Sequence, residues 1–123
     1  MSYHKLEVYQ LASELVRDIH VMTLKDLPDH EKYETGSQIR RSVKSIKSNI
    51  VEGYGRKIYK RDFLHYLVMA YSSAEETIDH LDTLVLSGSI KKDEKYTLLY
   101  NKADLLARKL NCFIKAVQKN HKT

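Results

Sequence analysis

The residues with the clearest chemical potential lie in one basic segment, residues 53–61. It reads Gly-Tyr-Gly-Arg-Lys-Ile-Tyr-Lys-Arg. Lysine and arginine neutralise phosphates and release counterions, which gives affinity without base specificity. Tyrosine rings stack on unpaired bases, at about 1–3 kcal/mol each. The segment therefore predicts a nucleic-acid contact. Its phosphate-binding candidates are Arg56, Lys57, Lys60 and Arg61, and its stacking candidates are Tyr54 and Tyr59.

A second group of cations favours the same interpretation. Arg40, Lys44 and Lys47 recur every three or four residues, so they share one side of a helix and extend the positive region. Both groups have a structural alternative. The first would be a helix cap followed by a solvated helix start, with one tyrosine in the core. The second would form ion pairs, within or between subunits, that contribute about 0–1 kcal/mol each. Their partners would be Glu75, Asp79 and Asp82.

Charge is segregated along the chain. The 123 residues carry 21 Lys and Arg against 16 Asp and Glu, for a net charge of +5. Residues 37–61 hold eight cations and only one acid, Glu52, and residues 108–123 hold five cations and no acid. Segregated charge creates a field that attracts polyanions, although it can also pair subunits. The secondary phosphate-binding candidates are Arg108, Lys109, Lys115 and Lys119.

Other polar residues on residues 34–54 suggest a structural role. Ser42, Ser45 and Asn49 lie on the other side of the apolar face, where small side chains let a second helix approach. We expect a run of buried, hydrogen-bonded polar groups that sets helix register. Its members are Arg41, Ser45, Asn49 and Glu52.

Motifs for catalysis and metal binding are missing from the sequence. Di-metal bundles need Glu-x-x-His on two helices, whereas this chain offers only Asp62-x-x-His65, and His80 after Glu76 points outward. Cys112 is the single cysteine and reads as a packing residue. No Ser-His-Asp arrangement, phosphate-binding glycine loop or dinucleotide fingerprint occurs. We expect no catalytic residues, no cofactor, no metal and no enzymatic activity.

Four helices must position these residues. Apolar residues recur every three or four positions over residues 5–24, 34–54, 60–86 and 91–119. We expect Gly53 and Gly55 to end the second helix in the left-handed conformation. Nothing indicates a strand, a linker or a second domain, so residues 1–123 are predicted to form one all-α domain, an antiparallel up-down four-helix bundle. With no signal peptide and no bilayer-length apolar stretch, we expect a cytoplasmic protein without membrane contact.

The last two helices carry more apolar surface than one bundle stripe needs. The third predicted helix adds Leu64, Val68 and Tyr71 beside its seam, and the fourth adds Leu98, Leu105 and Cys112. These rows could bury surface between subunits or widen the core of a monomer.

The second predicted helix also carries a specific motif. Residues 38–56 read QIRRSVKSIKSNIVEGYGR. This resembles the pattern Q-x-R-R-[AS]-x-x-S-I-x-x-N-I-x-E-G-x-G-R of the four-helix bundle proteins encoded by intervening sequences in bacterial large-subunit rRNA genes. These proteins often carry a ribosomal-protein label. The chain is also similar to the accessory proteins of diversity-generating retroelements. Support comes from Leu6-x-x-Tyr9-Gln10-x-Ala12 and Asp62-Phe63-x-x-Tyr66-Leu67-x-x-Ala70.

The resemblance implies a bundle that assembles into a homopentameric ring with a basic surface and no catalytic activity. For the retroelement relatives it implies binding to nucleic acid and to a reverse transcriptase. The chain departs from the usual family residues at three places. Lys47 and Ser42 stand where proline and alanine are usual, and Tyr71-Ser72 stands where Gly-Ser often occurs. Two hypotheses follow. The first is an oligomeric bundle that binds RNA or DNA through phosphate contacts. The second is a structural adaptor whose charges serve ring assembly, with a reverse transcriptase-like protein as partner.

Overall fold

The computed structural model describes residues 2–122, and within them all regular secondary structure is helical. A 3-10 turn, η1 (Tyr3–Lys5), precedes α1 (Glu7–Lys25) and the single turn α2 (Asp29–Lys32). Three long helices follow: α3 (Thr35–Gly55), α4 (Lys60–Leu86) and α5 (Glu94–Asn120). The predicted all-α four-helix bundle is confirmed.

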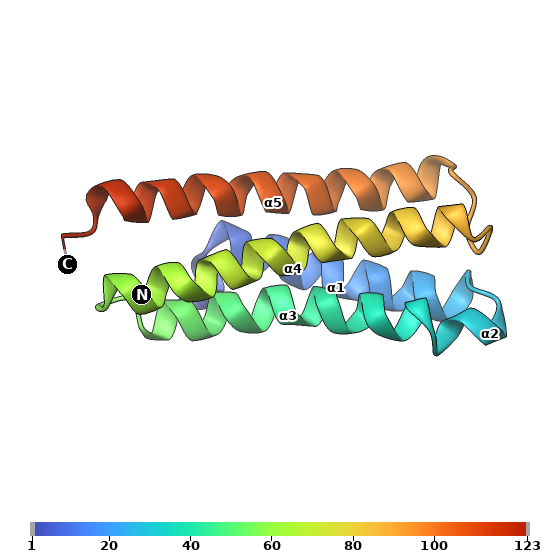
Figure 1. Cartoon of the computed structure of the whole chain (residues 1–123), viewed down its shortest axis with the longest axis horizontal. Helices are drawn as coiled ribbons and strands as arrows, with labels where there is room; N and C mark the ends of the chain where they lie inside the picture. Colours follow the sequence, from blue (N-terminus) through green and yellow to red (C-terminus); the bar gives the residue numbers. More distant parts are fainter. Residues whose placement is uncertain (1, 123) are drawn as a thin grey trace.

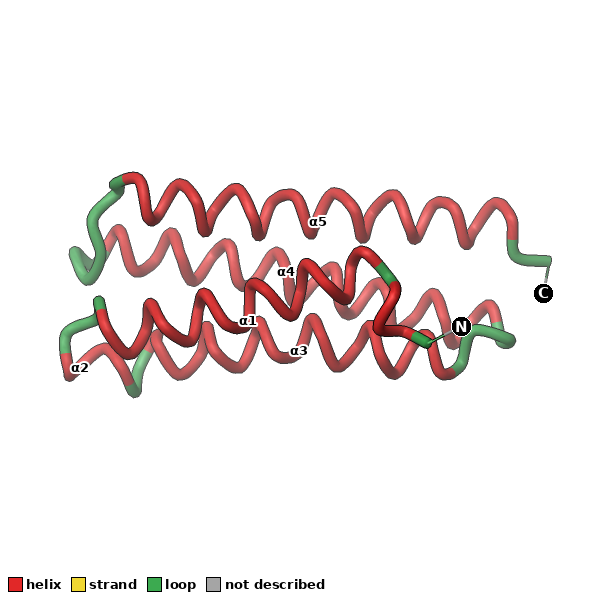
Figure 2. Tube along the Cα trace, turned by 180° about the vertical axis from the view of Figure 1, so that it is seen from behind, coloured by secondary structure: helices red, strands yellow, loops and turns green. Residues whose placement is uncertain are grey.

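The four long helices lie side by side and alternate in direction (Figure 1). Each of α1 and α4 packs against both α3 and α5, and α3 with α4 is the most extensive pair. The view from behind shows α1 lying across α3 and α4, with the connecting loops confined to the two ends (Figure 2). This is the up-down order that short loops produce.

Side-chain caps mark the starts of η1 and α5. Asp93 accepts a hydrogen bond from the Tyr96 backbone N–H at 3.1 Å, so α5 begins at Glu94 rather than near residue 91. At α1, Ser2 accepts from the His4 backbone N–H, and the chain forms η1 before the helix begins at Glu7. Pro28 precedes α2, where its fixed φ suits a helix start.

The predicted apolar faces form the core. On α1, the apolar residues spaced three or four apart are all buried: Val8, Ala12, Leu15, Ile19 and Met22. The matching buried face of α3 consists of Ile39, Val43, Ile46 and Ile50. On α4 the buried row drifts: Thr77 and Leu84 are buried, whereas Ile78 and Val85 are only half-buried. An α-helix has 3.6 residues per turn, so a long, straight seam moves sideways in this way.

The glycines act differently from our expectation. Gly53 is buried inside α3, and a Cβ there would lie 2.9 Å from the Tyr66 Cβ, so its role is close approach of α3 to α4. Neither Gly53 nor Gly55 has a positive φ, and the predicted left-handed closure of this helix is wrong. In residues 2–122 only Gly88, in the α4–α5 loop, takes a positive φ, of 78°.

A second, smaller cluster extends the bundle beyond α1. The first turns of α4 and the last turns of α5 project past the start of α1 (Figure 1). There Phe63, Leu67, Ile114 and Val117 bury one another, and Phe113 meets Phe63 edge-on with ring centroids 5.6 Å apart. This cluster supports the end of the bundle that carries the α3–α4 turn. Across residues 2–122, no helix combines the length and apolarity required to cross a membrane.

Candidate nucleic-acid interface

The two cation-rich parts of the sequence meet at one end of the bundle. The Lys60 ammonium donates to the backbone carbonyl of Gln118 at 3.0 Å, and His121 Nε2 lies 2.7 Å from the carbonyl oxygen of Lys57. These contacts join the α3–α4 turn to the end of α5. We call this surface the basic end; its residues are Arg56, Lys57, Lys60, Arg61, Lys115 and Lys119.

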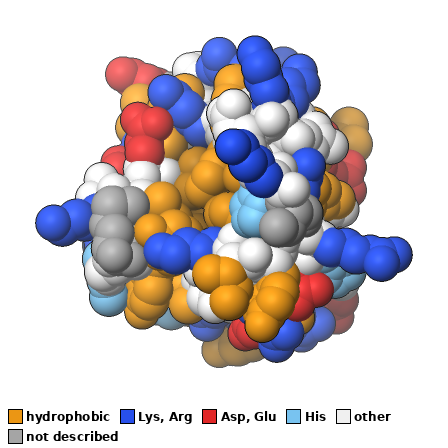
Figure 3. Space-filling model, turned by 90° about the vertical axis from the view of Figure 1, so that its left-hand side faces the viewer, with side chains coloured by type: hydrophobic (Ala, Val, Ile, Leu, Met, Phe, Trp, Pro, Cys, Tyr) orange, Lys and Arg blue, Asp and Glu red, His pale blue; other side chains and the backbone are white. Residues whose placement is uncertain are grey.

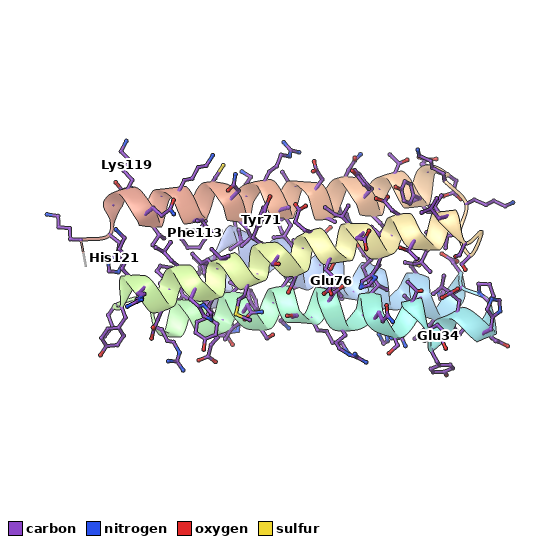
Figure 4. The ribbon with its side chains drawn as sticks, in the orientation of Figure 1. Glu34, Tyr71, Glu76, Phe113, Lys119 and His121 are labelled. Atoms are coloured by element: carbon purple, nitrogen blue, oxygen red, sulfur yellow. The ribbon has the colours of Figure 1, made fainter. Side chains whose placement is uncertain are left out.

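Seen end-on, lysine and arginine side chains project around the rim of this surface, with apolar side chains between them (Figure 3). Two of the exposed apolar residues belong to the α3–α4 turn: Ile58 is 69% exposed and Tyr59 is 62% exposed. Figure 4 shows Lys119 directed outward from α5 and His121 lying nearer the turn. Tyr59 therefore offers an accessible ring among cations, as the sequence predicts for a stacking residue.

Arg56 is largely committed to the turn itself. Its Nε lies 2.9 Å from Glu52 Oε2, its Nη1 lies 3.6 Å from Asp62 Oδ2, and its guanidinium sits 5.4 Å from the Tyr66 ring centroid. The hydrogen bond to Glu52, with the charges of Tyr66, Glu52 and Asp62, raises the pKa of Arg56. About half of the side chain remains exposed, so Arg56 anchors the turn and still reaches solvent.

Two lysines of the turn are also partly engaged. Lys57 Nζ lies 3.9 Å from the Tyr54 ring centroid, and Lys60 is held by Gln118. Tyr54 is half-buried and packs edge-to-face with Phe63. Because Lys57 also covers one face of the Tyr54 ring, a stacking role for Tyr54 is not favoured. Arg61 and Lys119 are exposed and form no ion pair with any residue in 2–122.

The three cations predicted to form a stripe on α3 have different surroundings. Arg40 is half-buried: Nη2 donates to the Lys32 carbonyl at 2.9 Å, and Nη1 is buried without a hydrogen-bond partner among the described residues. It holds α2 against α3 and is not presented to a phosphate. Lys44 is exposed. Lys47 is half-buried, with Nζ 5.6 Å from the Tyr9 ring centroid.

The carboxylates of α4 do not neutralise this row. Within residues 2–122, Glu75, Asp79 and Asp82 form no ion pair with the α3 cations. Asp82 accepts from the Tyr96 hydroxyl at 2.8 Å, and Glu75 raises the pKa of Tyr71 through its charge and a hydrogen bond, alongside burial. Pairing of these groups inside one subunit, one of the structural alternatives, is thus not observed.

The predicted run of buried polar groups is only partly buried. Arg41 and Glu52 are exposed, so the two ends of the predicted run are not buried. Ser45 and Asn49 are half-buried: Ser73 Oγ donates to Ser45 Oγ at 3.0 Å, and Asn49 Nδ2 donates to the Ser45 carbonyl at 2.9 Å.

The buried cross-helix contact instead involves Ser42, whose Oγ lies 2.8 Å from Thr77 Oγ1. The close approach of a second helix, expected from the small side chains, is confirmed.

The cations in the middle of α5 pair with carboxylates, whereas those near its end, within the described residues, do not. Lys102 pairs with Glu14 at 2.7 Å and with Asp18 at 2.5 Å, and Lys109 pairs with Glu7 at 3.3 Å, all across the α1–α5 contact. Arg108 pairs with Asp104 on its own helix. Of the secondary candidates, Lys115 and Lys119 are therefore the two that remain exposed without a carboxylate among the described residues.

The remaining reactive side chains do not assemble. In the described part of the chain, no three His, Cys, Asp or Glu side chains come together in a way that could hold a metal ion. Asp62 contacts Arg56, and His65 is exposed. Cys112 is exposed, so the expected packing role is wrong; the α5 seam buries Leu110 and Ile114 on either side of it.

Comparisons with known proteins agree on one relationship. The model of the protein family described as "23S rRNA-intervening sequence protein" matches residues 4–112. Among solved structures, a protein of unknown function from the S23 ribosomal protein family of Bacteroides thetaiotaomicron VPI-5482 superposes with a TM-score of 0.80. It is 26% identical, and the match covers 88% of this chain and 95% of that one. The search of curated proteins gave no significant match.

Proposed function

We propose, from the premise that the chain belongs to the 23S rRNA-intervening sequence protein family, that it is a non-enzymatic protein that binds RNA or DNA through the basic end. The observation that carries this proposal is the joining of residues 56–61 to the end of α5 by the Lys60–Gln118 and Lys57–His121 contacts. Those contacts concentrate cations from two distant segments on one surface.

Some cations of the basic end stabilise the turn through intramolecular contacts, and others are available to bind phosphate. Arg56 and Lys60 hold the turn and the α5 terminus through the bonds described above. Arg61, Lys115 and Lys119 are exposed and lack carboxylate partners in residues 2–122, which leaves their charge available to phosphates. Phosphate contacts fix orientation and carry no direct sequence information, so binding should discriminate weakly among sequences. Lys57 and Lys44 extend the positive surface from the turn along α3.

The test is a charge reversal that leaves Arg56 and Lys60 unchanged. The triple variant Arg61→Glu, Lys115→Glu, Lys119→Glu changes the net charge by about −6. A matched control makes the same change at the opposite end of the bundle, where Lys25, Lys91 and Lys92 are exposed. Affinity for a labelled structured RNA is measured by fluorescence anisotropy over a series of salt concentrations. We expect the first variant to weaken binding and to flatten the slope of log K against log salt by about 0.7–0.9 per lost contact.

Two results would count against the proposal. One is equal loss of affinity in both triple variants, which would mean that net charge alone attracts the RNA. The other is wild-type binding that does not change with salt, since phosphate neutralisation always releases counterions.

We also propose self-association through an apolar face of α4. Val68 is 50% exposed and Met69 is 42% exposed, and the half-buried Leu64 lies one helical turn before Val68. The resemblance implies a homopentamer. Sedimentation velocity of the wild type and of Val68→Asp tests this: a multimer that the substitution dissociates supports the proposal, and a monomeric wild type at high concentration contradicts it.

A second candidate function, the structural adaptor, is favoured by the unpaired charges of α3 and α4. Arg41 and Lys44 on α3, and Glu75 and Asp79 on α4, are exposed and form no ion pairs in residues 2–122. Such groups are free to pair between subunits and leave the remaining surface to a protein partner, for which a reverse transcriptase is the expectation. Dissociation of the oligomer by Lys44→Glu, and its recovery by adding Glu75→Lys, would support this function; an unchanged oligomer would argue against it.

A further inference from the structure

We infer that the aromatic cluster at the start of the chain, formed by Tyr3, His4 and Tyr9 beside Lys47, is a binding site for unpaired bases. The nucleic acid held by the basic end is then single-stranded, at least where it crosses this cluster. The inference rests on the proposed function, because it names the class of nucleic acid that the same surface would take.

The three rings form one aromatic cluster in which two rings are stacked. The Tyr3 and His4 rings are stacked, with centroids 4.2 Å apart and planes 24° apart. Tyr9 meets both rings edge-on, at 4.9 Å from Tyr3 and 5.4 Å from His4. Tyr9 is half-buried and packs against the main core, so it ties the unit to the bundle.

Hydrogen bonds hold the cluster in place before any ligand arrives. Ser2 Oγ lies 2.6 Å from His4 Nδ1 and accepts from the His4 backbone N–H at 3.3 Å. From α1, Gln10 Nε2 donates to the His4 carbonyl at 3.2 Å. A site whose side chains are already ordered loses less conformational entropy when it binds, so the stack is well prepared for a ligand.

His4 presents a ring face to solvent. Its side chain is exposed, Tyr3 covers one face, and Tyr9 touches an edge. Among the ring contacts of residues 2–122, Tyr3 and Tyr9 are the two that involve His4, so no aromatic ring covers its second face. A planar base placed there would continue the Tyr3–His4 stack, which is the arrangement used by proteins that bind single strands.

The cluster is continuous with the basic end. Lys47 Nζ lies 5.6 Å from the Tyr9 centroid, and Lys57 Nζ lies 3.9 Å from the Tyr54 centroid. Lys47 and Tyr54 are seven residues apart on α3, so they share a face and lie about 10 Å apart along the helix axis. Exposed Lys5 adds a further cation at the cluster. A strand can therefore place phosphates on lysines along this path while its bases reach the rings.

A base-paired duplex cannot use this site. Bases inside a helix are stacked on both faces, and proteins read double-stranded RNA through its shape, its phosphates and its 2′-hydroxyls. The exposed ring of His4 can stack only on a base that has at least one face not already stacked on another base. The structure therefore favours single strands, loops or ends over continuous duplex.

The experiment compares His4→Ala with His4→Phe. Both substitutions remove the imidazole contact with Ser2, and only the alanine variant removes the ring face, so their difference isolates stacking. Tyr33→Ala is the control for loss of an exposed aromatic residue, because Tyr33 is 78% exposed and follows α2 at the opposite end. The probes are a labelled, unstructured RNA of about 12 nucleotides and the same RNA annealed to its complement, both measured by anisotropy.

We expect His4→Ala to weaken single-strand binding about tenfold. His4→Phe and Tyr33→Ala should bind like the wild type, and duplex affinity should be unchanged in all variants. The inference is overturned if His4→Ala binds the single strand as well as His4→Phe does, or if it weakens duplex binding equally. If the basic-end triple variant loses affinity while His4→Ala does not, this inference alone fails; if neither variant loses affinity, the proposed function fails with it.

Discussion

Ser42 Oγ and Thr77 Oγ1 lie 2.8 Å apart in the buried contact between α3 and α4, although the two residues are 35 positions apart in the chain. Each hydroxyl also contacts a carbonyl of its own helix: Ser42 that of Ile39 at 3.1 Å, and Thr77 that of Ser73 at 2.9 Å. Serine and threonine can satisfy themselves on their own helix in this way, so the contact brings two polar residues into the core without an unpaired group. The helices can then approach more closely than larger side chains would allow.

Substitutions at Ser42 should separate hydrogen bonding from space. Ser42→Ala should lower the free energy of unfolding by only about 0.5–1.5 kcal/mol, because Thr77 keeps its bond to Ser73. Ser42→Leu should cost about 3 kcal/mol or more, since its volume must force α3 and α4 apart. Urea denaturation measures both, with Ser48→Ala as an exposed control. Equal stability of the alanine and leucine variants would show that the contact has spare room.

The two glycines near the end of α3 should respond in opposite directions. Gly53→Ala places a Cβ 2.9 Å from the Tyr66 Cβ and should lower the free energy of unfolding by about 1–3 kcal/mol. At Gly55 a Cβ meets nothing within 4 Å and the φ angle is not positive, so Gly55→Ala should stabilise the fold by about 0.4–1 kcal/mol. Thermal melts of the two variants provide the comparison. A stabilising Gly53→Ala would contradict the close approach described here.

Lys102 should make stability depend on acid. Hydrogen bonding to Lys102 lowers the pKa of Glu14 below its ordinary 4.5, so this pair stabilises the fold above that pH and is lost as pH falls through the lowered value. Lys102→Met should therefore have a lower melting temperature than the wild type at neutral pH. The difference in melting temperature should shrink below about pH 4.5. Lys92→Met, at an exposed position, serves as the control. A gap that stays constant down to low pH would exclude a contribution from Glu14.

Tyr96 should make stability depend on alkali. Burial, together with the hydrogen bond to Asp82, raises the pKa of Tyr96 from 10.0 to about 12. Because the pKa of Tyr96 is higher in the folded state, its protonated hydroxyl contributes fully to the free energy of unfolding below about pH 10. That contribution is lost as pH rises through about 12. Spectrophotometric titration of wild type and Tyr96→Phe should differ by one late-ionising phenol. Tyr96→Phe should also lower the free energy of unfolding by roughly 1.5–3 kcal/mol, the usual worth of a hydrogen bond to a charged group. The absence of a late phenol in the wild type would contradict the buried hydrogen bond.

Much of the fold could be predicted from local spacing. The buried row of α1 follows directly from apolar residues three and four apart, and α3 and α4 begin within a residue of their predicted starts. The structure differs from the prediction where a residue's surroundings come from another helix. The drift on α4 from Ile78 to Thr77 depends on how a straight helix lies against α3, and Gly53 is explained only by Tyr66 across the interface.

The candidate site divides along the same line. Residue types alone identified a cation-rich turn with an exposed Tyr59, because charge and ring chemistry belong to the side chains themselves. Sequence could not show that Arg40 is turned to the Lys32 carbonyl, or that Lys57 covers Tyr54, since these depend on rotamers and on neighbouring backbone.

What the sequence alone determined is the helical bundle, its family motif and its two basic segments, because helix periodicity and charge are properties of short stretches of chain. Only the tertiary structure decided that these segments meet, that carboxylates of α1 neutralise Lys102 in the middle of α5, and that Tyr3, His4 and Tyr9 form one aromatic cluster. Each of those outcomes depends on the direction and offset of packed helices. That geometry is set by how the whole core closes, which no single segment encodes.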